Sequence, residues 1–385
     1  MADGSVLGIP EIHGIPDSTL RVRQKARAWP AGTTIVSSDS HWLEGDIWVD
    51  RFPPHLRDRA PRMVFKDGGW QTFVDGKLVW PPAAEAAAVF CSGLECVPGM
   101  TDVAARLEDL DVEGVQKELL FPQRTIAIYM SGDVDIREHF FRAHNEAVAA
   151  FCAPARDRLF FVAVPNYWDP SAAAESLQEI KALGASALLV PRNPRKDVDG
   201  ETILWPSEKM APFWKAVEDS GLPLCFHIGE RVDLAAGGAA GTGFLINTQG
   251  FRATWGDLAF GGVFDRHPAL KVVFVEAGMN WVPGMLHDAD LAYHSFASMV
   301  QPKLAHTPSW YWRQHCYATF MTDPAGLRLL DMIGPETVMW SSDYPHQEST
   351  LGYSSSAIQA VFDATDVATA QKIVGKTALD LFKMG

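Results

Sequence analysis

The 385-residue chain is 47% hydrophobic and 21% charged, so it can bury a large core in one α/β domain or in two or three smaller ones. Its formal net charge of −14 argues against nucleic acid or an anionic membrane as a partner, because neither polyanion is attracted to an acidic surface. Residues 1–16 lack the basic start and apolar core of a secretory signal, and no apolar run is long enough for a membrane span. We therefore expect a cytoplasmic protein whose partner is a small molecule or another protein.

The start of the chain differs in composition from the rest. Residues 1–30 are rich in glycine, proline and charge without a clear period, which is typical of an arm that packs on the body or on a partner subunit. Residues 31–385 form the predicted body, with an insert at about 45–100. Asp-Gly pairs at 67–68 and 75–76 separate alternating runs in this insert, which indicates β-hairpins. We expect a small β flap beside the mouth of the site, and a homo-oligomer.

The body alternates between strand-like and helical patterns. The eight strand-like runs lie at 34–38, 117–121, 159–164, 187–190, 222–228, 271–276, 317–321 and 338–341. The helical patterns between them include 136–151, 171–183, 210–220, 281–299, 325–332 and 367–382. Apolar strands without polar alternation are buried on both faces, as in a parallel sheet under helices. The pattern predicts an α/β fold, a (β/α)8 TIM barrel with a small β insertion after strand one.

A doubly wound open sheet is the competing architecture. It is disfavoured because no Gly-x-Gly-x-x-Gly or Gly-x-x-x-x-Gly-Lys turn follows an early strand, so no nucleotide cradle is predicted. The chemically active residues instead follow several strands along the chain, which is how a barrel assembles a site on its carboxyl-end face.

The first predicted strand runs directly into Asp39 and His41. Residues two apart on a strand point the same way, so a carboxylate and an imidazole leave this strand side by side. Such oxygen and nitrogen donors suit zinc, manganese or iron. An Asp-x-His triplet also arises by chance, so the remainder of the chain has to decide.

Three later strands end in the same manner. Strand five ends at His227, strand six ends at Glu276, and strand eight leads into Asp343. Packing alone does not readily explain why four of the eight strands end at side chains that can act as acids, bases or metal ligands. We predict metal ligation by Asp39, His41, His227, Glu276 and Asp343, with the last three also taking part in catalysis.

These residues resemble the metal signature of the amidohydrolase superfamily. The likeness is specific to the amidohydrolase family 2 branch, which includes aminocarboxymuconate-semialdehyde decarboxylase and the resorcylate-type decarboxylases, and it spans roughly residues 34–383. The phrases that carry it are Phe226-His227-Ile228-Gly229, Glu276-Ala277-Gly278-Met279-Asn280-Trp281-Val282-Pro283 and Ser342-Asp343-Tyr344-Pro345-His346. The resemblance implies that strand one supplies two ligands, that His227 is a third, and that Asp343 is a ligand that also handles a proton.

Two departures from that family pattern concern the metal. Many members have His-x-His on strand one and the resorcylate-type decarboxylases have Glu-x-His, whereas Asp39 stands first here; a His usual on strand six is replaced by Glu276. With Asp343, three carboxylates then face one cavity and repel one another unless one or two cations neutralise them. The added negative charge makes iron or manganese as credible as zinc. We predict one or two divalent transition-metal ions.

The predicted site is compatible with three functional hypotheses. A bound divalent ion lowers the pKa of its water to about 7 and polarises carbonyls, and Asp343 is placed to accept the proton of that water. Glu276 has four open roles: bridging a second metal, acting as a second acid/base, orienting His227, or pairing with an arginine. The leading hypothesis is a metal-dependent hydrolase of an amide, ester or thioester of a small apolar or aromatic substrate. The alternatives are a metal-dependent non-oxidative decarboxylase of an aromatic or unsaturated acid, and a non-catalytic binding protein.

Further residues complete the predicted site. His346 could reach the metal, the substrate or only a loop carbonyl, and Glu44 could cap the next segment or touch an ion. Both are candidates for an outer role or for a second metal. Arg192 and Arg124 stand just past strands, where a guanidinium could hold a substrate carboxylate or phosphate, and a surface role for either is equally open. The glycine-rich stretch 229–250 is predicted to be a lid or a ligand-approach loop.

Overall fold

A computed structural model describes residues 26–66, 69–80, 97–125, 133–229, 241–242, 245–246, 249–346 and 348–385. Most of the predicted arm at 1–30, part of the insert and most of the glycine-rich stretch 229–250 lie outside these residues. The division into arm, body and insert stays a prediction. Within the described ranges, no helix combines the length and apolar composition needed to cross a membrane.

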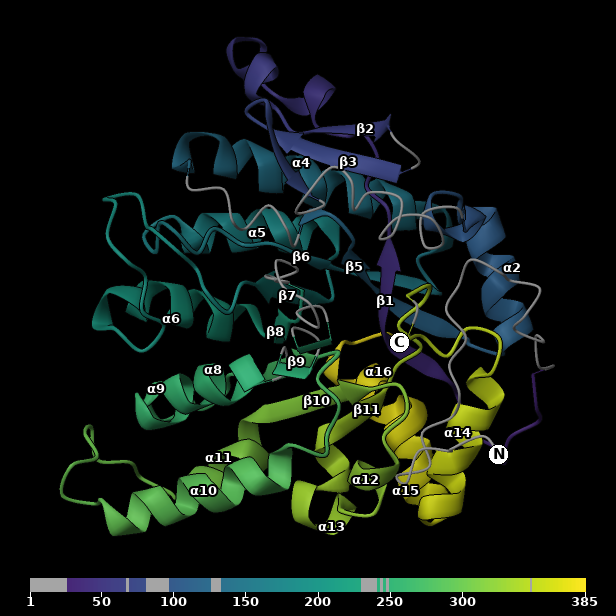
Figure 1. The fold of residues 1–385 in the computed structure, drawn as a ribbon, viewed down its shortest axis with the longest axis vertical. Helices are drawn as coiled ribbons and strands as arrows, with labels where there is room; N and C mark the ends of the chain where they lie inside the picture. The colour runs from purple at the N-terminus through teal and green to yellow at the C-terminus, as the bar shows by residue number, and fades with distance from the viewer. Residues whose placement is uncertain are drawn as a thin grey trace.

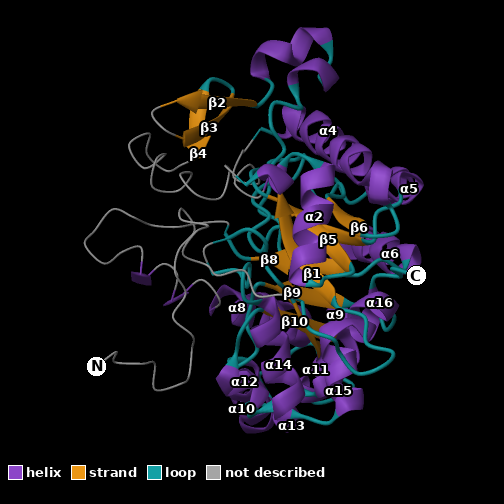
Figure 2. Cartoon of the chain, turned by 90° about the vertical axis from the view of Figure 1, so that its right-hand side faces the viewer, coloured by secondary structure: helices purple, strands orange, loops and turns teal. Residues whose placement is uncertain are grey.

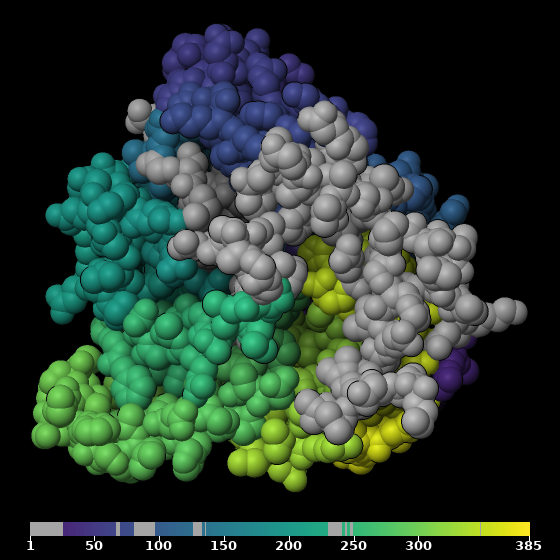
Figure 3. Space-filling view, in the orientation of Figure 1, coloured from purple at the N-terminus to yellow at the C-terminus, as the bar shows by residue number. Residues whose placement is uncertain are grey.

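The body is a barrel of parallel strands surrounded by helices (Figure 1). Its eight-stranded sheet has the order β1-β5-β6-β7-β8-β9-β10-β11. The strands are β1 (Val36–Trp42), β5 (Lys117–Pro122), β6 (Leu159–Ala163), β7 (Ala187–Val190), β8 (Leu224–His227), β9 (Val272–Val275), β10 (Cys316–Phe320) and β11 (Val338–Trp340). Figure 3 shows the chain running round the molecule, with purple at the top, teal and green on one side and yellow on the other. The predicted (β/α)8 barrel is confirmed.

The barrel closes where its first and last strands meet, a place called the seam below. A parallel bridge joins Ser40 to Tyr344, which lies just past the end of β11. Ser38 Oγ donates to the carbonyl of Trp340 at 2.6 Å. Ser37 Oγ accepts from the backbone N–H of Ser342 at 2.8 Å. Serine hydroxyls therefore supply much of the bonding that a strand ladder supplies elsewhere.

The remaining strands are held by ladders and apolar packing. All four residues of β7 and all four of β9 are buried. Strands of this kind are expected in a parallel sheet that is covered on both faces. They place the core between the sheet and its helices, so the carboxyl ends of the strands are free to carry chemistry.

The helices match the predicted patterns with several differences. They are α2 (Val103–Glu113), α4 (Val134–Cys152), α5 (Ala173–Leu183), α6 (Ala211–Ser220), α8 (Gln249–Phe260), α9 (Val263–Arg266), α10 (Val282–Ser295), α11 (Pro308–His315), α12 (Pro324–Leu327), α13 (Leu330–Ile333), α14 (Ser354–Ala364), α15 (Val367–Gln371) and α16 (Thr377–Leu381). The helix predicted over 281–299 ends at Ser295, and the one predicted over 325–332 is two short helices. Helices α2, α8, α9, α11 and α14 were not among the predicted patterns.

The last predicted helix, over 367–382, is interrupted by a π-helical turn at Lys372–Lys376. Gly375 lies in this turn, and a Cβ there would stand 1.8 Å from the carbonyl oxygen of Thr34. The glycine thus lets the helix backbone approach the start of β1 closely, and a π-turn absorbs the local mismatch.

The insert contains a separate three-stranded antiparallel sheet of β2 (Arg62–Lys66), β3 (Gly69–Val74) and β4 (Lys77–Trp80). Asp75 and Gly76 join β3 to β4 with φ angles of 53° and 71°. Two positive φ angles in a two-residue loop are what a type I′ hairpin requires, as the Asp-Gly signal predicts. Figure 2 shows this small sheet set apart from the barrel strands.

Candidate metal centre

Six of the predicted side chains meet at the carboxyl-end face of the barrel. They form two overlapping groups of possible ligands, in each of which the ligand atoms lie within 4.8 Å of one another. The first group is Asp39, His41, His227 and Glu276, and the second is His41, Glu276, Asp343 and His346. The four strand ends singled out in the sequence therefore converge.

Strand β1 places Asp39 and His41 together, as their spacing predicts. Asp39 Oδ1 lies 3.7 Å from His41 Nε2, and both side chains are fully buried or nearly so. His41 Nδ1 donates to the carbonyl of Pro122 at 3.2 Å. Since a carbonyl only accepts, the ring hydrogen sits on Nδ1 and the Nε2 lone pair faces the cluster.

His227, at the end of β8, is oriented in the same way. Its Nδ1 donates to the carbonyl of Ile228 at 2.8 Å. Its Nε2 then lies 3.4 Å from Asp39 Oδ1 and 3.6 Å from Glu276 Oε2. Two imidazoles thus present Nε2 lone pairs toward Asp39, an orientation usual for metal-bound histidine.

The donor atoms fit a divalent cation. Both carboxylate oxygens of Asp39, Nε2 of His41 and Nε2 of His227 are buried without a hydrogen-bond partner among the described residues. Buried polar atoms without partners are costly, and native proteins rarely keep them without a reason. A cation accepts all four lone pairs at once. The nitrogen and oxygen donor set suits zinc, iron or manganese.

Glu276 and Asp343 carry unusual backbone conformations. Their φ angles are 55° and 54°, in the left-handed region that favours glycine. The backbone N–H of Glu276 donates to Thr319 Oγ1 at 2.8 Å, and that of Asp343 donates to the carbonyl of Asp39 at 2.9 Å. Strained backbone that is held in place by such contacts is typical of functional sites. At these two positions the backbone conformation directs the carboxylates toward the cluster.

The cluster perturbs its own titratable groups. Burial raises the pKa of Glu276, and the charges of Asp343 and Glu348 raise it further. Burial lowers the pKa of His41, and the charge of His346 adds to that effect. Glu348 was not predicted; it lies just past the Asp-Tyr-Pro-His phrase. A bound divalent cation would neutralise the negative charge of these carboxylates.

His346 bridges Asp343 and Gln123. Its Nδ1 lies 3.0 and 3.1 Å from the two oxygens of Asp343, and its Nε2 lies 3.0 Å from Gln123 Oε1. Burial opposes a charge on His346, but the charge of Asp343 and its hydrogen bond outweigh burial and raise the pKa to about 9. The ring therefore donates to both partners. Gln123 was missed because an amide after a strand carries no signal by itself.

Glu44 has a different place from the ligands. Its side chain is buried, and its two oxygens accept the backbone N–H of Arg124 at 3.0 and 2.9 Å and that of Thr125 at 2.8 Å. Burial raises the pKa of Glu44, and these hydrogen bonds partly offset that effect. It belongs to neither group of possible ligands. These hydrogen bonds lie not in the segment that follows Glu44, which was predicted to be capped, but about 80 residues along the chain, just past β5.

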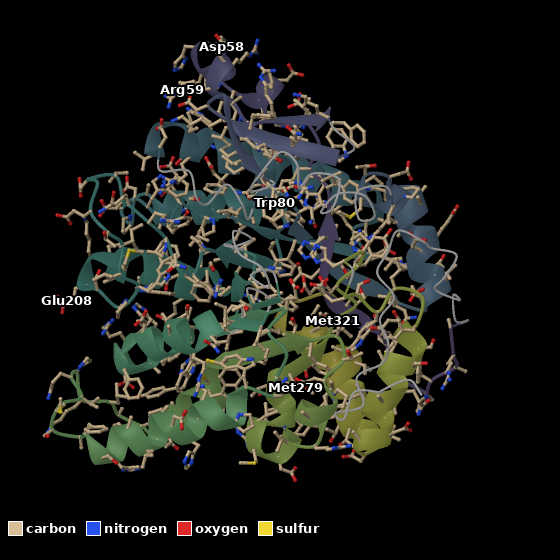
Figure 4. All side chains as sticks on the ribbon, viewed as in Figure 1. Asp58, Arg59, Trp80, Glu208, Met279 and Met321 are labelled. Carbon is tan, nitrogen blue, oxygen red and sulfur yellow. The ribbon has the colours of Figure 1, made fainter. Side chains whose placement is uncertain are left out.

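The two predicted substrate arginines each lie over an aromatic ring. The guanidinium of Arg124 is 5.7 Å from the ring centroid of Trp80, and that of Arg192 is 5.3 Å from the ring of Phe251. Trp80 ends β4 and is labelled in Figure 4 on the barrel side of the small sheet. Both arginines follow strands at the carboxyl-end face, and their role in binding substrate stays a prediction.

The family model for amidohydrolases matches residues 99–384. The chain belongs to the amidohydrolase family. This confirms the resemblance that the strand-end residues carry. A comparison with curated proteins found no match.

Solved structures share the amidohydrolase fold over most of the chain. An amidohydrolase from Mycobacterium avium subsp. paratuberculosis has 18% identity and a TM-score of 0.75 and covers 92% of this chain and 100% of its own. A 5-carboxyvanillate decarboxylase from Sphingomonas paucimobilis has 21% identity and a TM-score of 0.67, and the match covers 92% of this chain and 100% of that enzyme. A dihydroxybenzoic acid decarboxylase from Polaromonas with bound manganese and an inhibitor has 18% identity and a TM-score of 0.64, covering 91% and 97%.

Proposed function

We propose that this member of the amidohydrolase family is a metal-dependent, non-oxidative decarboxylase of an aromatic carboxylic acid. The observation that supports it most is the pairing of a buried group of possible ligands, Asp39, His41, His227 and Glu276, with a fold shared by two aromatic-acid decarboxylases, one of them bound to manganese. This proposal takes the second of the three hypotheses drawn from the sequence in place of the first.

The residues that would hold the metal are Asp39, His41, His227 and Glu276, which form one group of possible ligands, and Asp343, which belongs to the second group together with His41 and Glu276. A bound divalent ion would act as a Lewis acid that draws electron density from substrate oxygens. The two ligand groups share His41 and Glu276, so we propose a centre of one or two divalent ions. Zinc, iron and manganese all accept these donors.

The reaction needs one bond broken and one proton delivered. The bond between the ring carbon and the carboxylate breaks, its electron pair stays on the ring carbon, and carbon dioxide leaves. A proton then joins the ring carbon. We assign its delivery to a carboxyl oxygen of Asp343, because His346 Nδ1 lies within 3.1 Å of both oxygens and can return a proton there. Gln123 holds the far side of His346.

Hydrolysis of an amide, ester or thioester is the second candidate, and Glu276 is the feature that favours it. Its Oε2 lies 3.6 Å from His227 Nε2, at the strand-six place where the family resemblance implies a histidine. A carboxylate in this place would take the proton of an attacking water and pass it to the leaving group.

Product analysis in D2O separates the two reactions. The manganese-loaded protein is incubated with hydroxybenzoic acids and with aryl thioesters, while released carbon dioxide, released thiol and ring deuterium are measured. We expect carbon dioxide and one deuterium at the vacated ring carbon. Asp343→Asn should slow this reaction by about 10²-fold or more. Thiol release without carbon dioxide would overturn the proposal in favour of hydrolysis.

A further inference from the structure

A buried ion pair lies behind the metal centre, between α2 and β5. Arg106 of α2 and Glu118 of β5 are both 0% exposed. Arg106 Nε donates to Glu118 Oε1 at 2.6 Å, and its Nη2 donates to Oε2 at 2.9 Å. This is the two-pronged geometry in which a guanidinium fixes a carboxylate most firmly.

The remaining nitrogen of this guanidinium reaches the metal centre. Arg106 Nη1 donates to the backbone carbonyl of His41 at 2.6 Å. Since Glu118 lies on β5 and His41 on β1, the planar group ties the ligand-bearing end of β1 to its neighbour. The contact is to the main chain of a predicted ligand, so it sets the position of that residue without entering the cluster.

The face of the same guanidinium meets the other side of the seam. Its central carbon lies 4.1 Å from the ring centroid of Tyr344, and the hydroxyl of Tyr344 donates to Asp109 Oδ2 at 2.6 Å. Tyr344 directly follows Asp343, and its carbonyl accepts the N–H of His41 at 2.7 Å. His41 and Tyr344, on opposite sides of the seam, thus both contact the guanidinium of Arg106.

Stability alone does not account for these charges. A buried ion pair stabilises a fold no better than well-packed apolar side chains of similar volume. A guanidinium does fix the Glu118 carboxylate and the His41 carbonyl in its own plane while its face packs on the Tyr344 ring, which apolar side chains cannot do. We propose that Arg106 is a positioning residue of the metal centre, which holds His41 and, through Tyr344, Asp343 at ligand distances. The proposal rests on the metal cluster and not on the reaction.

The test removes both charges together, because Arg106→Met alone would leave Glu118 buried and unpaired. The double variant Arg106→Met with Glu118→Leu is compared with the wild type in titrations of the metal-free protein with Mn2+. We expect apparent Mn2+ affinity to fall by about 10–100-fold, the range found for residues that orient ligands. The visible absorption bands of the Co2+ form should also shift, because they report ligand geometry.

Arg158 provides the matched control. Like Arg106, it pairs with a carboxylate, that of Asp111 at 2.7 Å, and donates to a backbone carbonyl, that of Val115 at 2.9 Å, but its side chain contacts no predicted ligand. Arg158→Met should leave Mn2+ affinity and the Co2+ bands unchanged. Urea unfolding of each metal-free variant reports separately on the fold.

A folded double variant with wild-type Mn2+ affinity and wild-type Co2+ bands would overturn the proposal. If the double variant does not fold, Tyr344→Phe carries the test, because it removes only the hydroxyl bond to Asp109. A shift of the Co2+ bands and a severalfold loss of Mn2+ affinity in Tyr344→Phe supports the role, and wild-type behaviour overturns it.

Discussion

Two sides of one barrel are built from different interactions. Strand β7 pairs with β6 and β8 in continuous parallel ladders, and all its side chains are buried and apolar. The seam between β1 and β11 has a single bridge in the described chain and is joined by serine hydroxyls, with the Arg106 guanidinium behind it. Backbone ladders and apolar packing hold the first side, and side-chain hydrogen bonds with a single bridge hold the second.

This difference bears on how three of the predicted ligands are positioned. Apolar packing tolerates small displacements, because many weak contacts share the adjustment. Ligand atoms around a cation tolerate much less, because coordination distances vary by only about 0.2 Å. Two predicted ligands of β1, and Asp343 just past β11, stand at the seam where hydrogen bonds fix the backbone. The ladder side then contributes mainly to the stability of the fold, and the seam fixes the positions of these three predicted ligands.

The largest expected effect separates metal binding from fold stability on neighbouring strands of the ladder side. His227→Ala removes a predicted ligand, so the protein should lose most of its bound metal while its metal-free form unfolds at nearly the wild-type urea concentration. Leu189→Ala, on the neighbouring strand β7, should cost about 2–5 kcal/mol of unfolding free energy and keep its metal. Elemental analysis and urea unfolding of both variants measure the two quantities. Unchanged metal content in His227→Ala would remove His227 from the ligand set.

The second effect concerns Glu44, which follows β1 and belongs to neither group of possible ligands. Glu44→Ala leaves two buried backbone N–H groups, those of Arg124 and Thr125, without their acceptor. Each such group costs about 1–3 kcal/mol, so the unfolding free energy should fall while metal content is kept.

Glu44→Gln is the control for that variant, because its amide oxygen still accepts one N–H. It should lose less stability than Glu44→Ala. Metal loss in either variant, at a level similar to that in His227→Ala, would show that Glu44 is a ligand after all.

Much of the fold could be predicted because its signals are local. The strands of the barrel are short apolar runs, and the residues at the ends of β8, β9 and β11 are read directly from the sequence. The convergence of Asp39 with His227 needs only the rule that carboxyl ends of parallel strands meet at one face.

The features that could not be predicted depend on contacts between distant segments. Gln123 acquires its role only from His346, 223 residues away. Helix α2 was missed because its buried positions include Arg106, Asp109 and Glu113, so the apolar period that marks a helix is absent. The same charged face is the one that reaches His41. The buried charged residues that remove the helical pattern from the sequence therefore include the one, Arg106, that connects α2 to the candidate metal centre.

The smallest expected effect separates a buried histidine outside the cluster from those inside it. His144 of α4 is fully buried, its Nδ1 lies 3.2 Å from Thr125 Oγ1, and burial lowers its pKa from 6.5 to about 3. Below pH 6.5 the unfolded chain binds a proton at this residue that the folded chain does not, so stability falls with pH toward 3. Between about pH 7.5 and pH 5.5 the wild type should lose about 1.4 kcal/mol more than His144→Asn. Urea unfolding at both pH values measures this difference, and parallel losses in the two proteins would mean that His144 is not held neutral by burial.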